Sequence, residues 1–504
     1  MAFVQNVPFF SIILSMFSGT ISSVLPGKYA RILNTIMISC VTIMSVWLLI
    51  FLCQSDIGSY TFMMGHFPAP WGNEIRAGVL EALMATFFSI VMLLSLWGGR
   101  KKLDDEVEQT KHNIYYILMN LMLSSLLALI YTNDLFTAYV FVEINTIAAC
   151  GLIMIRQNGR TIEAAVRYMI MSLLGSGFLL MGICMLYDLT GHLLMSNIKE
   201  KVSLIMESGT YSVPMLITIG IMTIGLAIKS ALFPFHSWLP DAYGYSTVSS
   251  AAVLSSLVSK GYIFLLIKIF YRVIGFEYIA GSHILNILFL FGLCGMIFGS
   301  VSAIWENDIR RMIAFSSVAQ IGYIYMGFGL GTEVGMVASI FHILAHGATK
   351  SLLFVSAIGL TDVSAGSRKF FNITGGAYRN KIAGVGFMVG SLSMVGIPMF
   401  SGFVSKLLFA ESAVKAMSWK MFPTLIVLAI STILNAIYFL KTVLRIYTPE
   451  APQAEKAKGF YRITCKEQKL YTITIILFII LNLILGVMSE PIIRLIYDGL
   501  NNFM

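Results

Sequence analysis

About fourteen runs of apolar residues, each near the length needed to cross a bilayer, dominate this chain. A spanning helix needs about 20 predominantly apolar residues, because the hydrocarbon core holds no water to bond exposed backbone groups. On that measure the expected span cores are 8–25, 32–53, 78–97, 113–131, 134–155, 164–187, 213–235, 247–271, 284–304, 311–330, 334–359, 382–411, 422–446 and 470–495. We therefore predict an all-α integral membrane protein with about 14 transmembrane helices. The first run has no basic segment before it, so we expect a retained helix.

Composition argues against a sizeable soluble domain and against several classes of site. The chain is 57% hydrophobic and 12% charged, whereas soluble domains are about 25% charged. Its six cysteines include no C-x-x-C pair, which gives no case for zinc, an iron–sulfur cluster or a disulfide framework. No G-x-G-x-x-G opens a strand–helix unit, and no Walker loop or Ser-His-Asp order occurs. We expect no cofactor and no metal in the chain itself.

Loop charge predicts the orientation in the membrane. The basic residues of the first, third, fifth and thirteenth loops are Lys28, Arg31, Arg100, Lys101, Lys102, Lys111, Arg156, Arg160, Lys456, Lys458, Arg462 and Lys466. The second and fourth loops hold only Arg76. Because cytoplasmic loops carry the Lys/Arg excess, we predict a cell-membrane protein with odd loops in the cytoplasm and both termini on the outer face. The net charge of +9 is typical of this bias, and no aromatic-interleaved basic patch indicates nucleic-acid binding.

Two of the expected spans are interrupted by helix-breaking residues. The 213–235 run breaks at Pro234, and the 382–411 run breaks at Gly396 and Pro398. Broken helices at matching places in two halves indicate an inverted repeat and point to a transport site. We predict N-terminal helices in 1–110, a first inverted five-helix repeat in 111–272, a second in 283–447, and a cytoplasmic loop with a final helix in 448–504.

Glu143 and Lys229 lie deep within expected spans. A charge at mid-membrane costs roughly 2.5–3.5 kcal/mol on insertion scales, so such residues face the bundle interior and serve ion movement. Each of the two keeps its charge more easily when the other is near, so a change in their separation would load or release a proton. The alternatives are a structural ion pair for Glu143 and a lysine that snorkels from a helix end for Lys229.

Further basic residues mark the later spans. Lys260 is central in its run and too deep to snorkel, whereas Lys268 lies nearer the end and is expected to snorkel. His342, His346 and Lys350 recur at a spacing of four residues and share one helix face. Histidine titrates near neutral pH, so this face suits a proton relay. Structural roles and an H-x-x-x-H metal pair are the alternatives, although no third ligand is evident.

Two residues beside the helix breaks complete the candidate set. Lys406 follows the second break and mirrors Lys229, with Glu411 as a candidate partner. His236 lies beside the first break, where it would serve as a relay or as a cap on free backbone carbonyls.

Six segments carry a resemblance to a known family: DLFTAYVFVEI, KSALFPFHSWLPDAY, SLVSKGYIFLLIK, AFSSVAQIGYIYMG, FHILAHGATKSLLFVSAIGL and GIPMFSGFVSKLLFAES. Within about residues 75–446 the chain resembles the antiporter-like proton-pumping subunits of respiratory complex I. The same family includes subunits of multisubunit, Mrp-type sodium/proton antiporters and of membrane-bound energy-converting hydrogenases. The segment after Asp134 is closer to the latter two branches.

The resemblance implies roles for the buried charges. Glu143 and Lys229 match an interacting glutamate–lysine pair, and Lys260 matches a connecting lysine. His342, His346 and Lys350 match linking elements, and Lys406 matches the terminal group facing the exit. Where the family often has a histidine after the WLPD segment, this chain has Tyr243, which weakens the case for a second input relay there.

The predicted function is a proton-translocating subunit of a multisubunit energy-converting complex, of hydrogenase type or similar to a NADH- or ferredoxin-quinone reductase. The expected partners are other membrane subunits, a peripheral redox arm, protons or sodium, and the lipid bilayer. One alternative is a subunit of a redox-independent sodium/proton antiporter. A second is a scaffold that conducts no protons, against which the full set of costly buried charges argues. A solitary small-solute transporter is disfavoured, because lysines and no evident substrate pocket flank the breaks.

Overall fold

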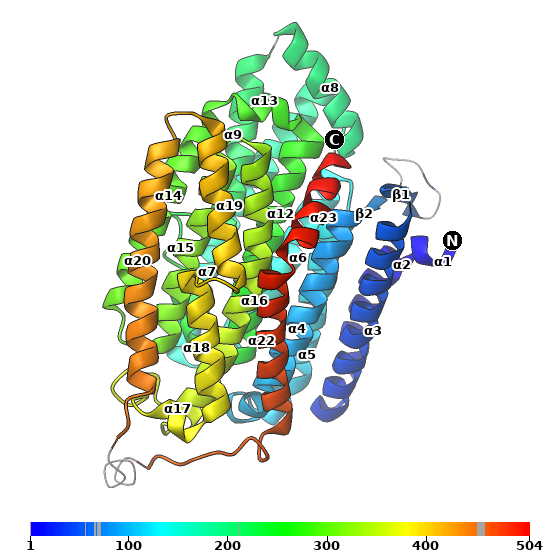
Figure 1. The fold of residues 1–504 in the computed structure, drawn as a ribbon. Coiled ribbons are helices and arrows are strands. Elements are labelled where there is room, and N and C mark those ends of the chain that lie inside the picture. Colours follow the sequence, from blue (N-terminus) through cyan, green and yellow to red (C-terminus); the bar gives the residue numbers. More distant parts are fainter. Residues whose placement is uncertain are drawn as a thin grey trace.

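The protein is a bundle of long helices that run side by side along one axis (Figure 1). The computed structural model describes residues 2–55, 57–64, 67, 72–209, 211–450 and 459–503. Within these residues, twelve helices are long and apolar enough to cross a membrane, and two shorter apolar helices occupy the other expected spans. The predicted all-α, multi-pass membrane fold is confirmed. Lys456 and Lys458 of the thirteenth loop lie outside the described residues.

The elements that occupy the expected spans follow the predicted order. They are α2 (Val7–Ser22), α3 (Gly27–Gln54), α4 (Val79–Glu106), α5 (His112–Tyr131), α6 (Leu135–Met154), α7 (Gly159–Thr190), α9 (Ser212–Lys229), α11 (Val248–Val253) with α12 (Ser259–Lys268), α14 (His283–Trp305), α15 (Ile309–Gly329), α16 (Glu333–Asp362), α18 (Lys381–Val395) with α19 (Ser401–Ala416), α20 (Met421–Ile446) and α22 (Lys469–Val487). The connecting helices are α1 (Ala2–Gln5), η2 (Gln109–Lys111), α8 (Met195–Ser208), α10 (Leu239–Tyr245), α13 (Phe276–Ala280), α17 (Gly376–Arg379) and α23 (Ser489–Asn501).

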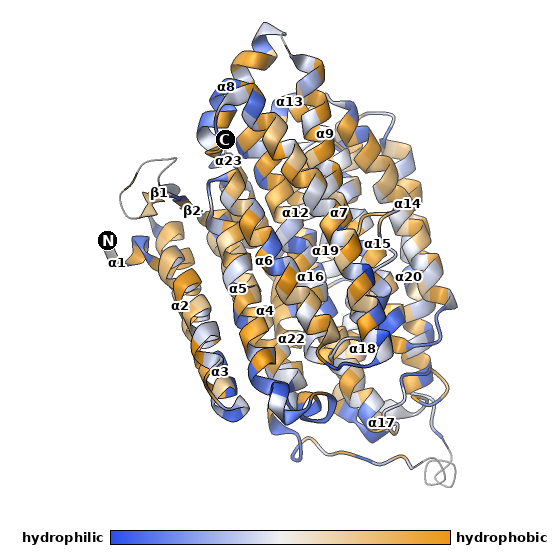
Figure 2. Cartoon of the chain, turned by 180° about the vertical axis from the view of Figure 1, so that it is seen from behind, coloured by the Kyte–Doolittle hydropathy of each residue, from blue (hydrophilic) through white to orange (hydrophobic). Residues whose placement is uncertain are grey.

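Two spans form the buried centre of the bundle. One is the continuous helix 248–274, in which π-helical segments η3 (Leu254–Val258) and η4 (Ile269–Ile274) flank α12. The other is α16, and both bury their whole apolar stretch, whereas α3, α20 and α22 bury only 33% of theirs. A helix that is apolar all round belongs in a core or in lipid. Polar residues gather at the end of the bundle that carries α17 and on α8 (Figure 2).

Both expected interruptions are present, and the first begins earlier than predicted. Helix α9 ends at Lys229, and the chain makes turns until α10 begins. The residue before a proline disfavours helical angles, so the helix ends ahead of Phe233–Pro234 and not at Pro234. In the second break, Gly396 adopts a φ of +90°, and helix resumes at Ser401.

Two local features depart from the expected pattern. Strands β1 (Ser59–Met63) and β2 (Glu74–Gly78) pair antiparallel in the second loop, where aromatic and β-branched residues favour extended backbone. The final expected span, 470–495, is divided, because α22 ends at Val487 and α23 begins at Ser489. Pro491 fits the first turn of α23, where its missing N–H leaves no bond unmade.

Candidate functional site

Glu143 and Lys229 are in contact inside the bundle. Glu143 lies mid-way along α6 and Lys229 is the last residue of α9, with 3.4 Å between the Glu143 Oε1 and Lys229 Nζ atoms. Lys229 is fully buried, whereas the Glu143 side chain is 25% exposed on the isolated chain. The Ser176 hydroxyl donates to Glu143 Oε1, and Lys229 Nζ donates to Thr146 Oγ1 at 2.8 Å. Each member of the pair therefore has one hydroxyl partner besides the other.

Close packing of α7 against α9 fixes the position of Lys229. A Cβ atom on Gly175 would lie 2.8 Å from the Gly225 carbonyl oxygen and 2.9 Å from Lys229 Cγ. Small residues let two membrane helices approach this closely. The backbone contact at Gly175 and Gly225 thus holds the stem of Lys229 in place.

We expect Gly175→Ala to destabilise the protein by about 1–3 kcal/mol, the usual range for overpacking a tight contact, and to displace Lys229. Gly177→Ala is the matched control, because nothing lies within 4 Å of a Cβ built at Gly177 on the same helix. The measurement is the thermal unfolding midpoint of both variants, together with proton transport. Equal midpoints for the two variants would contradict the described packing.

Tyr262 connects Lys229 with the central helix. The Lys229 Nζ atom lies 5.3 Å from the centroid of the Tyr262 ring, within the range of a cation–π contact. The Tyr262 hydroxyl donates to Asn145 Oδ1 at 3.0 Å, and the Asn145 amide donates to Ser125 Oγ at 2.9 Å. A polar network therefore reaches from the Glu143–Lys229 pair into α12.

Lys260 lies in the first turn of α12, directly after the π segment η3. Its side chain is fully buried, and Nζ donates to the carbonyl of Ser255. A π segment shifts the backbone bonds by one residue and is frequent at functional sites. The Ser259 hydroxyl lies 3.0 Å from that of Tyr243. The Ser255 carbonyl is thus the one hydrogen-bond partner of Lys260 Nζ among the described residues, and no described carboxylate pairs with it.

The two histidines of α16 stack on each other. The ring centroids of His342 and His346 are 6.0 Å apart and the planes differ by 7°. His342 Nδ1 lies 2.9 Å from Ser405 Oγ, and its ring stacks on Tyr323 at 5.4 Å. Both ring nitrogens of His346 and Nε2 of His342 are buried without a hydrogen-bond partner among the described residues. A neutral imidazole has one N–H and one acceptor nitrogen, so His346 can take up one proton without breaking a bond to another described residue.

Lys350 and Lys406 are the last two predicted proton carriers along the sequence. Lys350 Nζ donates to the Ile313 carbonyl at 3.0 Å and to the Ser316 hydroxyl. Lys406 Nζ donates to the carbonyls of Met394 and Val395, at 3.2 and 2.7 Å, and to Thr432 Oγ1 at 3.2 Å. Lys406 therefore binds the last turn of α18 from the adjoining half-helix α19.

A small cavity separates Lys406 from the histidines. Its volume is about 10 Å³, which is room for about one water. His342, His346, Lys406 and Gln320 are among its lining residues. His342, His346 and Lys406 thus border one small space beside the second helix break.

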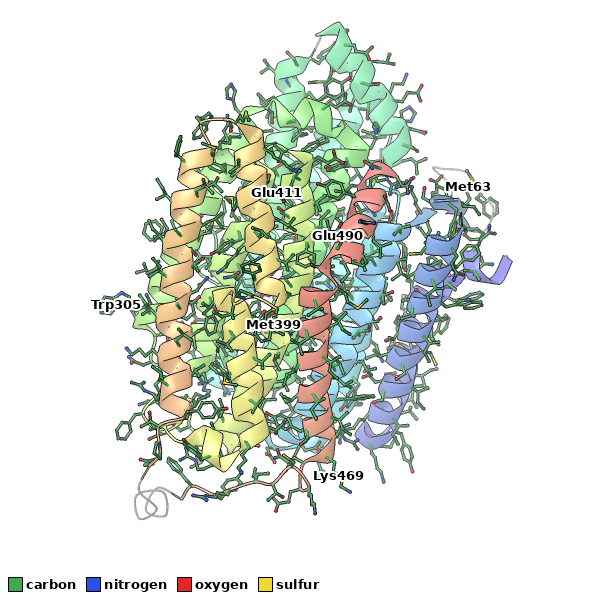
Figure 3. All side chains as sticks on the ribbon, viewed as in Figure 1. Met63, Trp305, Met399, Glu411, Lys469 and Glu490 are labelled. Atoms are coloured by element: carbon green, nitrogen blue, oxygen red, sulfur yellow. The ribbon has the colours of Figure 1, made fainter. Side chains whose placement is uncertain are left out.

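Two expectations about lysine partners are wrong. Glu411 forms an ion pair with Lys415 at 2.6 Å and does not contact Lys406, because it lies further along α19 from the break at Met399 (Figure 3). Lys268 does not snorkel. It is fully buried and donates to the carbonyls of Leu129, Ile130 and Thr132, because the end of α5 lies at the same depth.

His236 lies in the turn after α9. Its ring stacks on Phe233 at 5.4 Å, and its Nδ1 atom is buried without a hydrogen-bond partner in the described ranges. It contacts neither Glu143 nor Lys229 in any described bond. The choice between a relay and a backbone cap stays open.

The structure brings together some predicted residues and separates others. Glu143 contacts Lys229, and His342 contacts His346, whereas Lys260 and Lys350 make bonds only to residues outside the predicted set. Sequence reasoning missed the polar residues between them, namely Ser125, Asn145, Thr146, Ser176, Ser316, Tyr262, Tyr323 and Ser405. The spacing of Thr146 from Glu143, and of Tyr262 from Lys260, was a weak signal. Within the described residues, no group of three or more His, Cys, Asp and Glu could hold a metal ion.

Comparisons with known proteins place the chain among membrane subunits. Residues 132–433 match the profile of the family described as "NADH:quinone oxidoreductase/Mrp antiporter, TM". The NADH-quinone oxidoreductase subunit N of Desulforudis audaxviator is 33% identical over 400 residues, 78% of this chain and 76% of that protein. A Na(+)/H(+) antiporter subunit of Alkalihalophilus pseudofirmus is 26% identical over 462 residues, 92% of this chain and 89% of that protein. A chain of the Mrp complex from Dietzia has the same fold, with a TM-score of 0.86, 22% identity, and coverage of 100% of this chain and 98% of that one.

Proposed function

Because the chain belongs to the NADH:quinone oxidoreductase/Mrp antiporter family of transmembrane subunits, we propose that it carries protons across the cell membrane as one subunit of an energy-converting complex. The proposed carriers are Glu143, Lys229, Lys260, His342, His346, Lys350 and Lys406. The observation that carries the proposal is the Glu143–Lys229 contact at 3.4 Å inside an apolar bundle. A carboxylate and a lysine that each stabilise the other's charge form a switch when their separation changes.

In the proposed cycle, movement of Glu143 away from Lys229 releases a proton from the lysine toward Lys260. The Tyr262 ring lies 5.3 Å from Lys229 Nζ, and Tyr262 belongs to the same helix α12 as Lys260, on a different face. Ordered water would bridge the remaining gap, because polar contacts longer than a hydrogen bond are commonly bridged this way. The hydroxyls around η3 offer partners for such water.

From Lys260 the proton would continue through the histidines of α16 to Lys406. The unpaired nitrogens of His342 and His346 and the cavity beside them support this step, because histidine accepts and returns protons near neutral pH. Lys350 would carry the proton together with His346 in this part of the route. Lys406, at the second break, is the proposed last carrier before the exit.

We propose the domain arrangement and orientation on the same basis. The breaks after α9 and after α18 support two inverted five-helix repeats, in 111–272 and 283–447, flanked by 1–110 and 448–504. The odd-numbered loops are rich in Lys and Arg, which supports a cytoplasmic location for the end of the bundle that carries them. Both termini would then lie on the outer face.

The proposed partners are other membrane subunits, with a peripheral redox arm as the energy source. Similarity to a subunit of a quinone oxidoreductase supports a redox-driven complex. The second candidate is a redox-independent sodium/proton antiporter, supported by similarity over 92% of the chain to an antiporter subunit. A non-conducting scaffold is the third candidate, and the buried lysines speak against it.

The test is to purify the chain with whatever holds it, identify the partners by mass, and reconstitute the complex in liposomes with a pH-sensitive dye. Co-purifying iron–sulfur and nickel or flavin subunits, with proton uptake driven by an electron donor, would support the redox-driven pump. A set of small membrane subunits alone, with proton movement driven by a sodium gradient, would support the antiporter. An intact complex that moves no protons under either drive would contradict both.

A further inference from the structure

A charged cavity lies at the end of the bundle where the odd-numbered loops meet, apart from the proposed proton carriers. It has a volume of about 650 Å³ and is lined by side chains from α4, α7, α10, α11, α15 and the segment after α16. Its charged lining residues are Lys102, Asp105, Glu106, Arg156, Arg160, Arg310 and Arg368. Five basic and two acidic side chains thus face one space of the size that proteins use for small ligands.

Three guanidinium groups crowd around one aromatic ring at this cavity. The Cζ atoms of Arg160, Arg311 and Arg368 lie 5.5, 5.6 and 5.4 Å from the centroid of the Tyr245 ring. Like charges held this close repel each other unless carboxylates or a bound anion lie between them.

The carboxylates nearby pair with two of the three guanidinium groups. Arg311 pairs with Asp241 and Glu306, and Arg368 pairs with Asp308. Arg160 has no carboxylate partner among the residues that the structure describes. The cation–π contact with Tyr245 orients Arg160 without cancelling its charge.

Arg310 adds a buried positive charge to the wall of the cavity. It lines the cavity and is only 2% exposed. One of its terminal nitrogens donates to the carbonyls of Tyr243 and Ser246, and the other lies 4.0 Å from Glu106. Its Nε atom is buried without a hydrogen-bond partner in the described ranges.

We propose that this cavity binds a phosphate-bearing anion through Arg160 and Arg368, with Arg310 adding positive charge to the cavity wall. The planar guanidinium matches phosphate oxygens two at a time, which favours phosphate over a halide. The headgroup of an anionic phospholipid and a soluble phosphate compound share this chemistry, and basic pockets at the ends of membrane helices suit the former. The concave shape favours a small anion over an acidic segment of a partner protein.

The test uses the intact complex in lipid nanodiscs and compares Arg160→Gln with Lys369→Gln. Both substitutions remove one positive charge from the same face, but Lys369 is exposed and does not line the cavity. Arg160→Gln should fold normally, because the side chain is exposed and contacts only the Tyr245 ring. In phosphatidylcholine discs, pyrophosphate is titrated by calorimetry. In discs that also contain phosphatidylglycerol, native mass spectrometry counts the retained lipid.

We expect one saturable site for one of the two probes, weakened by about tenfold or more in Arg160→Gln and unchanged in Lys369→Gln. Saturation by pyrophosphate would assign a soluble anion, and retained phosphatidylglycerol would assign a lipid headgroup. The proposal is overturned if neither probe saturates, if the two variants bind alike, or if a partner subunit's segment fills the cavity in the complex. None of these outcomes depends on proton transport, so the test is independent of the proposed function.

Discussion

Glu143→Gln should reduce proton transport by about a hundredfold or more while leaving assembly of the complex intact, because a positioned proton-transfer group contributes about 10²–10⁴-fold. Glutamine keeps the shape of the side chain and can accept from Ser176, but it carries no charge to balance Lys229. The switch then loses the group whose distance sets the charge on the lysine. The measurement is dye-monitored proton uptake by the reconstituted complex.

Glu163→Gln is the matched control for this experiment. Glu163 is 63% exposed on α7 and pairs with Arg167, so its loss removes a surface ion pair that contributes little. If the pair acts as a unit, adding Lys229→Met to Glu143→Gln should cost little more than Glu143→Gln alone. Transport at the control's rate in Glu143→Gln would remove the pair from the mechanism.

Lys260→Met and Lys260→Arg should both reduce transport by about a hundredfold, although arginine keeps the positive charge. Arginine does not deprotonate in proteins, so it preserves a fixed charge but cannot pass a proton. Methionine has a similar length and leaves only the Ser255 carbonyl without its donor. The two variants therefore separate a carrier from a structural charge.

The measurement is the same proton uptake, compared with the yield of assembled complex for each variant. Recovery of transport in Lys260→Arg alone would mean that Lys260 supplies charge and carries no proton. Loss of assembly in Lys260→Met but not in Lys260→Arg would indicate a role in the fold of the buried helix 248–274.

The sequence predicts the fold well, because the length of an apolar run determines whether a helix crosses the membrane. The order of the spans and the two breaks follow from such local signals, and the family follows from the six motif segments. Three features could not be predicted from these signals: the end of α9 at Lys229, the division of the last span, and the two π segments. These features depend on a choice among nearby backbone hydrogen bonds that the apolar pattern leaves open.

The contact between Glu143 and Lys229 is predicted from the sequence, but most other contacts of the candidate residues are not. Buried charge alone identifies Glu143 and Lys229, and the cost of burying them makes a partner necessary. The same reasoning fails for Lys268, because its distance from a helix end does not reveal that three carbonyls of a neighbouring segment lie at that depth. The prediction that Glu411 pairs with Lys406 fails for a similar reason, because Glu411 pairs instead with Lys415, one helical turn away.

Counting N–H groups distinguishes two of the buried lysines, Lys260 and Lys268. An ammonium has three hydrogens to donate, and a neutral amine has two. Lys268 donates to three carbonyls, so a neutral Lys268 would leave one acceptor empty. Lys260 donates to a single carbonyl and has a hydrogen to spare in either form. Lys268 therefore needs its charged form to bind all three carbonyls at the end of α5. Lys260 keeps its hydrogen bond to the Ser255 carbonyl whether or not it has lost a proton.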